Sequence, residues 1–169
     1  MQNSQPPAAN RLCLMRHAHS GWPRPGERDF DRTLDDKGFA EAELVSQLAA
    51  DRNYVPELIL SSTAVRCRQT TEALQRAFGV ETEIRFVDDL YNAPMENYLS
   101  LMGAQQNGSI LLVGHNPAME ALLEALLGPD RTSAVIPTGY PTAGLAVLDK
   151  GGTIMGLAGN WLLTDFLQP

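Results

Sequence analysis

The sequence has few of the features that would assign it to several large classes of protein. It contains two cysteines, Cys13 and Cys67, and their spacing favours two buried reduced thiols over a disulfide or a CxxC site. No apolar run approaches the ~18 residues that a membrane-spanning helix requires. Residues 1–10 are polar and lack the apolar stretch of a signal peptide, so we expect a flexible tail there and a cytoplasmic protein.

Positive charge is also scarce. The 169 residues include 13 Lys and Arg against 20 Asp and Glu, which gives a formal net charge of −7. A chain of this charge is poorly suited to nucleic acid or to an anionic membrane, and we expect neither as a partner. Any group of arginines that gathers at one place therefore runs against the overall charge and marks a candidate anion-binding site.

The sequence does contain a regular alternation of apolar strand patterns and amphipathic helix patterns. This alternation predicts an α/β fold, a three-layer α/β/α sandwich with a mainly parallel sheet, in one domain over residues 11–169. The last strand is the candidate for an antiparallel orientation. Predicted strands cover 12–15, 58–62, 84–87, 109–113 and 145–148. Gly151-Gly152 predicts a hairpin that joins the strand at 145–148 to a further strand at 153–157.

Helices are predicted over 36–50, 63–78, 94–104 and 117–127. Asp35 is the expected N-cap of the first helix, and Gly79 the residue that ends the second. Asn116 and Pro117 suit the N-cap and first turn of the last helix, which Gly128-Pro129 should end. A loop with Pro137, Gly139 and Pro141 is predicted before the strand at 145–148.

Cations and imidazoles follow three of the apolar runs directly. Arg16 and His17 end the first run, Arg66 lies in the first turn after the second, and His115 follows the third. In a parallel sheet such strand-to-helix junctions lie at one edge, which is where open α/β sheets bind ligands. We therefore expect these four side chains to converge, although about a hundred positions separate them.

Three motifs in this order carry a resemblance to a known family. They are Arg16-His17, Ser61-Ser62-x-x-x-Arg66-x-x-Gln69-Thr70 and Gly114-His115-Asn116-Pro117. Together they resemble the histidine phosphatase superfamily, also called phosphoglycerate mutase-like, over about Leu12 to Asp149. The length and the ending are similar to its small bacterial SixA-type phosphohistidine phosphatases. One departure is that Ala18 stands where the family usually has glycine after Arg-His.

The resemblance implies roles for these residues. His17 would be the nucleophile, neutral at its attacking nitrogen, and Arg16 and Arg66 would bind phosphoryl oxygens with their planar forks. His115 would donate to the phosphoryl group, preferably in its protonated form, beside free N–H groups of the helix that begins at Asn116. Arg32, in the polar loop over 20–33, matches the family's segment that places an arginine near the phosphate.

We expect no cofactor and no metal. His17-x-His19 is the one pattern with some resemblance to a metal motif, but no carboxylate or cysteine stands beside it in a ligand spacing. His19 is therefore predicted at the rim of the site or in solvent. The arginines already supply positive charge for a bound phosphate, so a metal is not needed for that purpose.

The family resemblance implies a metal-independent phosphatase that acts through phospho-His17, with phosphohistidine on a protein as its substrate. Two alternatives stay open: a phosphatase or mutase for a small phosphorylated metabolite, and a non-catalytic phosphate-binding module. Family members that cleave alkyl esters usually carry an acid in a Leu-x-Glu context, whereas this chain has Leu90-Tyr91-Asn92. Asn92 cannot transfer a proton, and Asp89 would serve only if the loop bends back.

Overall fold

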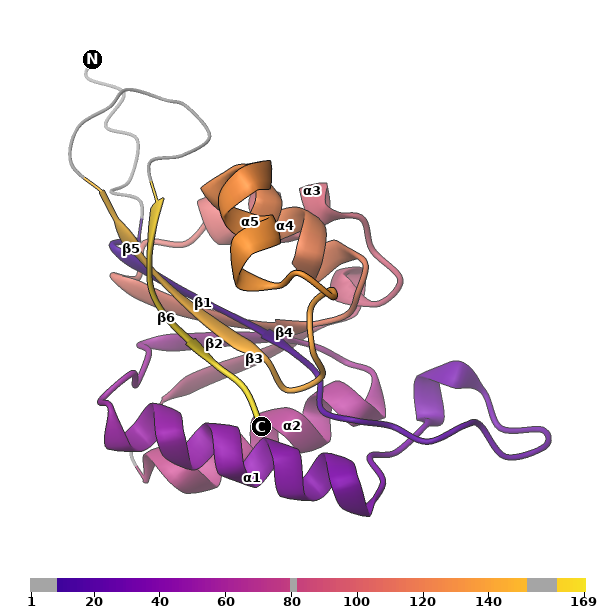
Figure 1. Ribbon diagram of the computed structural model, residues 1–169. Helices are drawn as coiled ribbons and strands as arrows, with labels where there is room; N and C mark the ends of the chain where they lie inside the picture. Colours follow the sequence, from indigo (N-terminus) through magenta and orange to yellow (C-terminus); the bar gives the residue numbers. More distant parts are fainter. Residues whose placement is uncertain (1–8, 80–81, 152–160) are drawn as a thin grey trace.

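Six strands and five helices are arranged in three layers (Figure 1) in the computed structural model, which describes residues 9–79, 82–151 and 161–169. The α/β/α sandwich is as predicted. The strands are β1 Arg11–Arg16, β2 Leu58–Ser62, β3 Glu83–Val87, β4 Ser109–Gly114, β5 Leu145–Lys150 and β6 Trp161–Leu167. The helices are α1 Asp36–Asp51, α2 Val65–Phe78, α3 Met95–Gly103, α4 Ala118–Leu127 and α5 Pro129–Val135, with short 3-10 turns η1 Asp29–Asp31 and η2 Asp88–Leu90.

The strands form one sheet in the order β3-β2-β4-β1-β5-β6. β1 to β4 are parallel to one another, β5 is antiparallel to β1, and β6 is antiparallel to β5. The strand that runs against the rest is therefore β5 rather than the last one. The predicted hairpin partner at 153–157 lies outside the described residues, and β5 pairs with β6. This topology brings the carboxyl ends of β1, β2 and β4 side by side.

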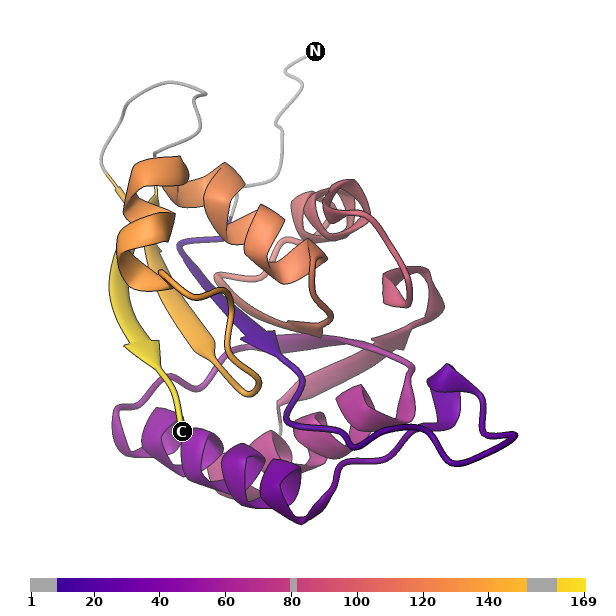
Figure 2. The same ribbon diagram turned by 45° about the vertical axis from the view of Figure 1, so that its right-hand side comes forward.

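The two faces of the sheet are buried under different helices. α1 and α2 cover one face, and α3, α4 and α5 cover the other (Figures 1 and 2). Successive residues of β1 alternate between them: Met15 packs in the cluster that contains Val45, while Leu14 packs in the cluster that contains Leu122. Each such side chain contributes roughly 1.5–3 kcal/mol on burial. Burial on both faces explains why the central strands read as continuous apolar runs.

Two of the predicted helix boundaries are confirmed by local geometry. Asp35 caps α1, because its Oδ1 accepts the N–H of Gly38 at 2.8 Å. Gly79 ends α2 in the left-handed conformation, at φ 59°, which glycine adopts without a steric penalty.

The start of α4 was predicted incorrectly. The helix begins at Ala118, Pro117 occupies the N-cap position, and Asn116 lies one residue outside it. Asn116 nevertheless satisfies the first turn, because its Oδ1 accepts the N–H of Glu120 at 3.2 Å. The expected residue, Asn116, therefore does cap the helix, but from one position before the N-cap.

A further helix, which the sequence analysis does not predict, follows Gly128-Pro129. α4 does end at Leu127, but Pro129 begins a further helix, α5. Proline is well suited to the first helical position, since the N–H that it lacks would have no partner there. The same dipeptide thus ends one helix and starts the next.

Candidate active site

A cavity of about 530 Å³ lies at the carboxyl edge of the sheet. All five residues predicted for the site line this cavity, so their side chains do lie close together in the structure. The lining residues are Arg16, His17, His19, Ser20, Asp29, Arg32, Arg66, Tyr91, Asn92, His115, Asn116 and Thr142.

His17 is held as a neutral imidazole with one nitrogen free. It follows β1 directly, and its backbone N–H donates to the carbonyl of Gly114 in the neighbouring strand. Its Nδ1 lies 2.7 Å from the carbonyl oxygen of Ala18, an acceptor, so Nδ1 carries the proton and Nε2 keeps its lone pair. Burial is the main cause that lowers the pKa of His17 to about 3. The ring is therefore unprotonated at neutral pH, as a nucleophile requires.

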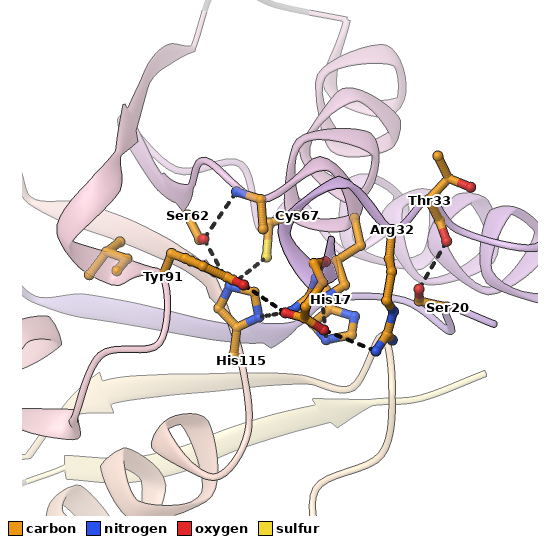
Figure 3. Close-up of polar contacts among 12 residues, drawn as sticks. His17, Ser20, Arg32, Thr33, Ser62, Cys67, Tyr91 and His115 are labelled. Carbon is orange, nitrogen blue, oxygen red and sulfur yellow. Dashed lines mark hydrogen bonds and ion pairs between the residues drawn. The ribbon is translucent and has the colours of Figure 1, made fainter. Parts of the chain in front are cut away.

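Arg66 connects the two histidines of the site. Its Nε donates to Nε2 of His17 at 3.3 Å, and its Nη2 lies 3.2 Å from Nδ1 of His115. Figure 3 shows the rings of His17 and His115 close together at the site. The other end of the guanidinium is held by Asp29, whose carbonyl oxygen accepts from Nη1 at 2.8 Å and whose Oδ2 accepts from Nη2 at 3.1 Å. The side chain is buried, so its fork has a fixed orientation.

His115 is neutral in this structure. Arginine has no acceptor atom, so Nδ1 of His115 accepts from Arg66 and the proton lies on Nε2, which is 2.8 Å from the hydroxyl of Ser62. Burial first, and then the charge of Arg66, lower the pKa of His115 to about 4. The resemblance implies a protonated His115 beside a phosphoryl group, whereas burial and the charge of Arg66 act against that charge. A phosphoryl anion would supply the opposite charge that favours protonation.

Arg16 and Arg32 bring two more cations to the cavity. Nη1 of Arg16 donates to the carbonyl of Tyr140 at 2.7 Å, and Nη1 of Arg32 donates to Oδ1 of Asp29 at 3.1 Å. The Nε atom of each is buried and has no hydrogen-bond partner among the described residues. Cationic donors left over at a cavity favour an anionic occupant.

The loop over 20–33 is fixed at both of its ends. Ser20 and Leu34 form a β-bridge, and the N–H of Leu34 donates to the side chain of Gln69 on α2 at 2.8 Å. Gly38 allows α1 to begin against the preceding strand end, since a Cβ there would lie 1.9 Å from the carbonyl oxygen of His19. This anchoring explains how Arg32 and η1 are held over the cavity.

Asp29 and Tyr91 are site residues that the sequence did not reveal. The hydroxyl of Tyr91 donates to Oδ2 of Asp29 at 2.8 Å, and the Tyr91 ring lies edge-on to the ring of His115. Burial acts to raise the pKa of Asp29, but the Tyr91 bond and the charges of Arg66 and Arg32 outweigh it and hold that pKa below its usual value. Nothing in a polar loop that carries several charges distinguishes Asp29 from its neighbours.

Three further predictions about the site have different outcomes. His19 does lie at the rim, where its Nδ1 is 2.6 Å from Oδ2 of Asp35. The expected free N–H groups of α4 are wrong for two amides of the first turn, because those of Met119 and Glu120 donate to the carbonyl of His115 and to the side chain of Asn116. Asp89 does not line the cavity, whereas Asn92 does.

Within the described part of the chain, no three His, Cys, Asp or Glu side chains are grouped as metal ligands would be. No helix found there has the length and apolar character to cross a membrane.

Comparison with known proteins places this geometry in a family. The model of the histidine phosphatase superfamily (branch 1) matches residues 12–98. A chloroplastic protein of Arabidopsis thaliana, itself uncharacterized, is 32% identical over 131 residues, which cover 71% of this chain and 60% of that protein. The chain thus spans less than two thirds of that relative.

Solved structures agree with this assignment. A candidate phosphohistidine phosphatase SixA from Agrobacterium tumefaciens is 56% identical, with a TM-score of 0.88 over 95% of this chain and 99% of that one. The protein histidine phosphatase SixA complexed with tungstate shares the fold at 20% identity, with a TM-score of 0.73 over 94% of this chain and 96% of that one. The chain therefore belongs to branch 1 of the histidine phosphatase superfamily.

Proposed function

We propose that this chain is a metal-independent phosphohistidine phosphatase that acts on phosphorylated proteins through a phosphohistidine intermediate on His17. The observation that carries the proposal is the state of His17: its Nδ1 proton is held by the Ala18 carbonyl, and its Nε2 lone pair faces a cavity lined by three arginines. A neutral nucleophile among fixed cations is the arrangement that phosphoryl transfer requires.

In the first step, the Nε2 lone pair of His17 attacks phosphorus. The bond between phosphorus and the leaving group breaks, and its electron pair stays on the leaving atom. The His17 ring becomes cationic, and the hydrogen bond from Nδ1 to the Ala18 carbonyl stabilises it. Arg16, Arg32 and Arg66 compensate the charge on the three equatorial oxygens.

In the second step, a water molecule attacks the phosphorus of phospho-His17. The P–N bond breaks, its electron pair returns to Nε2, and inorganic phosphate leaves. In both steps His115 would act once the phosphoryl anion has raised its proton affinity, with Nδ1–H as the donor to a phosphoryl oxygen. Its Nε2, bound to Ser62, fixes the orientation of the ring.

Two observations support phosphohistidine as the substrate. The relative at 56% identity is described as a candidate phosphohistidine phosphatase. In addition, the amide of Asn92 lines the cavity where family members that cleave alkyl esters carry an acid, so a leaving alkoxide would lack a proton donor there. The P–N bond of phosphohistidine is labile enough to break without one. The cytoplasmic location and the protein partner remain predictions.

The proposal is tested by comparing turnover of a phosphohistidine peptide, an aryl phosphate and alkyl phosphates under the same conditions. We expect the phosphohistidine peptide to be preferred, the aryl phosphate to be intermediate and the alkyl phosphates to be poor. Equal kcat/KM on a small alkyl phosphate would favour a metabolite phosphatase instead. Binding of phosphate without turnover of any substrate would identify a non-catalytic module.

A further inference from the structure

The carboxylate of Asp29 stands at the mouth of the site, at the opposite end of Arg66 from the nucleophile. The Nε atom of Arg66 bonds to His17, while its two Nη atoms bond to Asp29 at 2.8 and 3.1 Å. In an in-line transfer, the leaving group departs on the side of phosphorus that is opposite to His17 Nε2. Asp29 lies at the end of Arg66 that is remote from His17 and is half-exposed, so a leaving group on the solvent side of the site can reach it.

Asp29 is also chemically distinct from the rest of the cavity wall. It is the one carboxylate among the described residues that line the cavity, beside three arginines. The hydroxyl of Tyr91 and the charges of Arg66 and Arg32 keep it ionised and oriented. About half of its side chain is exposed, at 48%, so an incoming substrate can reach a carboxylate lone pair.

We propose that Asp29 determines the leaving group that this phosphatase accepts, by selecting a cationic, N–H-bearing base over an anionic or purely alkyl group. The inference rests on the proposed function and names its substrate class more closely: phosphoramidates whose leaving group is a protonated nitrogen base, with the phosphohistidine ring as the main case.

The chemistry of the departing ring explains the selection. When the P–N bond of phosphohistidine breaks, the electron pair goes to the ring nitrogen that carried phosphorus. A ring with a proton on its other nitrogen is cationic before this step and leaves as neutral imidazole, whereas an unprotonated ring would have to leave as an anion. A carboxylate that accepts the N–H of the other nitrogen favours the protonated ring, in the way that carboxylates orient and charge histidines within enzymes.

The same carboxylate disfavours other phosphates. Phosphoglycerate carries a carboxylate close to the phosphoryl group, and this second anion would meet Asp29 at the mouth of the site. An alkyl phosphate whose alkyl group carries no charge offers Asp29 no hydrogen-bond donor. The carboxylate would therefore lose its solvation without gaining a new partner. Both effects act on the choice of substrate and leave the histidine chemistry unchanged.

The test is a comparison of Asp29→Asn with the unmodified protein on two substrates, a phosphohistidine peptide and phosphoglycerate. Asp31→Asn is the matched control, because Asp31 lies on the same turn, is bonded to Arg28 and does not line the cavity. We expect Asp29→Asn to lower kcat/KM for the phosphohistidine peptide by about tenfold or more, the size expected for loss of a hydrogen bond to a charged group. Its kcat/KM for phosphoglycerate should rise, and Asp31→Asn should change neither.

A second variant distinguishes the loss of the Asp29 charge from a distortion of the loop that carries it. Tyr91→Phe removes one bond to Asp29 but keeps its charge, and it should shift the ratio of the two kcat/KM values in the same direction by less. Equal gains on both substrates in Asp29→Asn would show that Asp29 merely competes with phosphate for Arg66, and an unchanged ratio would overturn the inference. Failure of the unmodified protein to cleave phosphohistidine would instead overturn the proposed function, and this inference with it.

Discussion

Arg66 Nε donates to His17 Nε2 across 3.3 Å, so the guanidinium faces the lone pair that the proposed reaction uses. This contact places a fixed positive charge beside the nitrogen, which disfavours its protonation and is one of the causes, after burial, of the low pKa of His17. It also means that an oxygen of a phosphoryl group approaching His17 arrives next to a donor that is already oriented.

His17→Ala should lose nearly all turnover and retain phosphate binding, because the three arginines remain in place. The measurement pairs steady-state assays with phosphate binding by calorimetry. In the unmodified protein, quenching without acid after mixing with labelled substrate should trap a phosphoenzyme that acid then hydrolyses. Label that is stable to acid, or unimpaired rates in the variant, would contradict the role of His17.

Arg66→Ala and His115→Ala should each reduce kcat by about 10²–10³, the usual cost of removing one oriented donor from a transition state. Arg66→Lys is the informative partner variant, since a lysine keeps the charge but cannot bond His17 and His115 at the same time. Rates in Arg66→Lys close to those of the unmodified protein would show that charge alone matters and that the fork geometry does not.

The free energy of unfolding should depend on pH in a defined direction. The pKa values of His17 and His115 are lowered to about 3 and about 4, whereas an unfolded histidine titrates near 6.5. Between these values the unfolded chain binds protons that the folded chain does not, so stability falls as the pH decreases from about 6.5. Each histidine contributes a slope of at most about 1.4 kcal/mol per pH unit.

Chemical denaturation at a series of pH values measures this slope. His17→Asn should flatten the acid side of the curve, because asparagine does not titrate. The opposite result, a variant with the same slope as the unmodified protein, would show that His17 keeps an ordinary pKa in the folded state.

Asp89→Asn and Asn92→Ala should both leave turnover of the phosphohistidine peptide almost unchanged. Asp89 lies outside the cavity, and Asn92 cannot transfer a proton. Kinetics on the peptide and on an alkyl phosphate check this pair. Loss of alkyl phosphate turnover in Asp89→Asn would show that the loop does bend back and that an acid is available after all.

Dialysis against EDTA should not alter activity, and added Zn²⁺ or Mg²⁺ should not increase it. The proposed reaction uses arginine and histidine side chains for the work that a metal does in other phosphatases. Activity abolished by the chelator and restored by metal would refute the mechanism.

Much of this architecture could be predicted because it follows from local patterns. Apolar runs of strand length ended at Arg16, His17 and His115, and the rule that parallel strands share a carboxyl edge was enough to bring these residues together. Asp35 and Gly79 were predictable for the same reason, since a helix cap depends on a few neighbouring residues.

The features that could not be predicted depend on tertiary contacts. Asp29 becomes part of the site because Leu34 is bonded to Gln69 on α2, which fixes the end of a loop whose own sequence has no regular pattern. The neutral state of His115 follows from its burial beside Arg66, and burial is a property of the complete fold. The α5 helix was not predicted because Gly128-Pro129 is typical of the end of a helix, whereas here the same dipeptide also begins the next one.

The position of β1 gives the chain a definite order of assembly. β1 is made first, yet its partners are residues 109–114 on one side and 145–149 on the other. A ribosome must therefore synthesise more than a hundred residues after the nucleophile before the strand that carries it can be enclosed. Until then, Arg16 and His17 belong to an open apolar segment with no opposing histidine. The proposed phosphatase activity therefore requires that β1 has paired with β4 and β5, and a nascent chain that stops before His115 would carry the nucleophile without the rest of the proposed site.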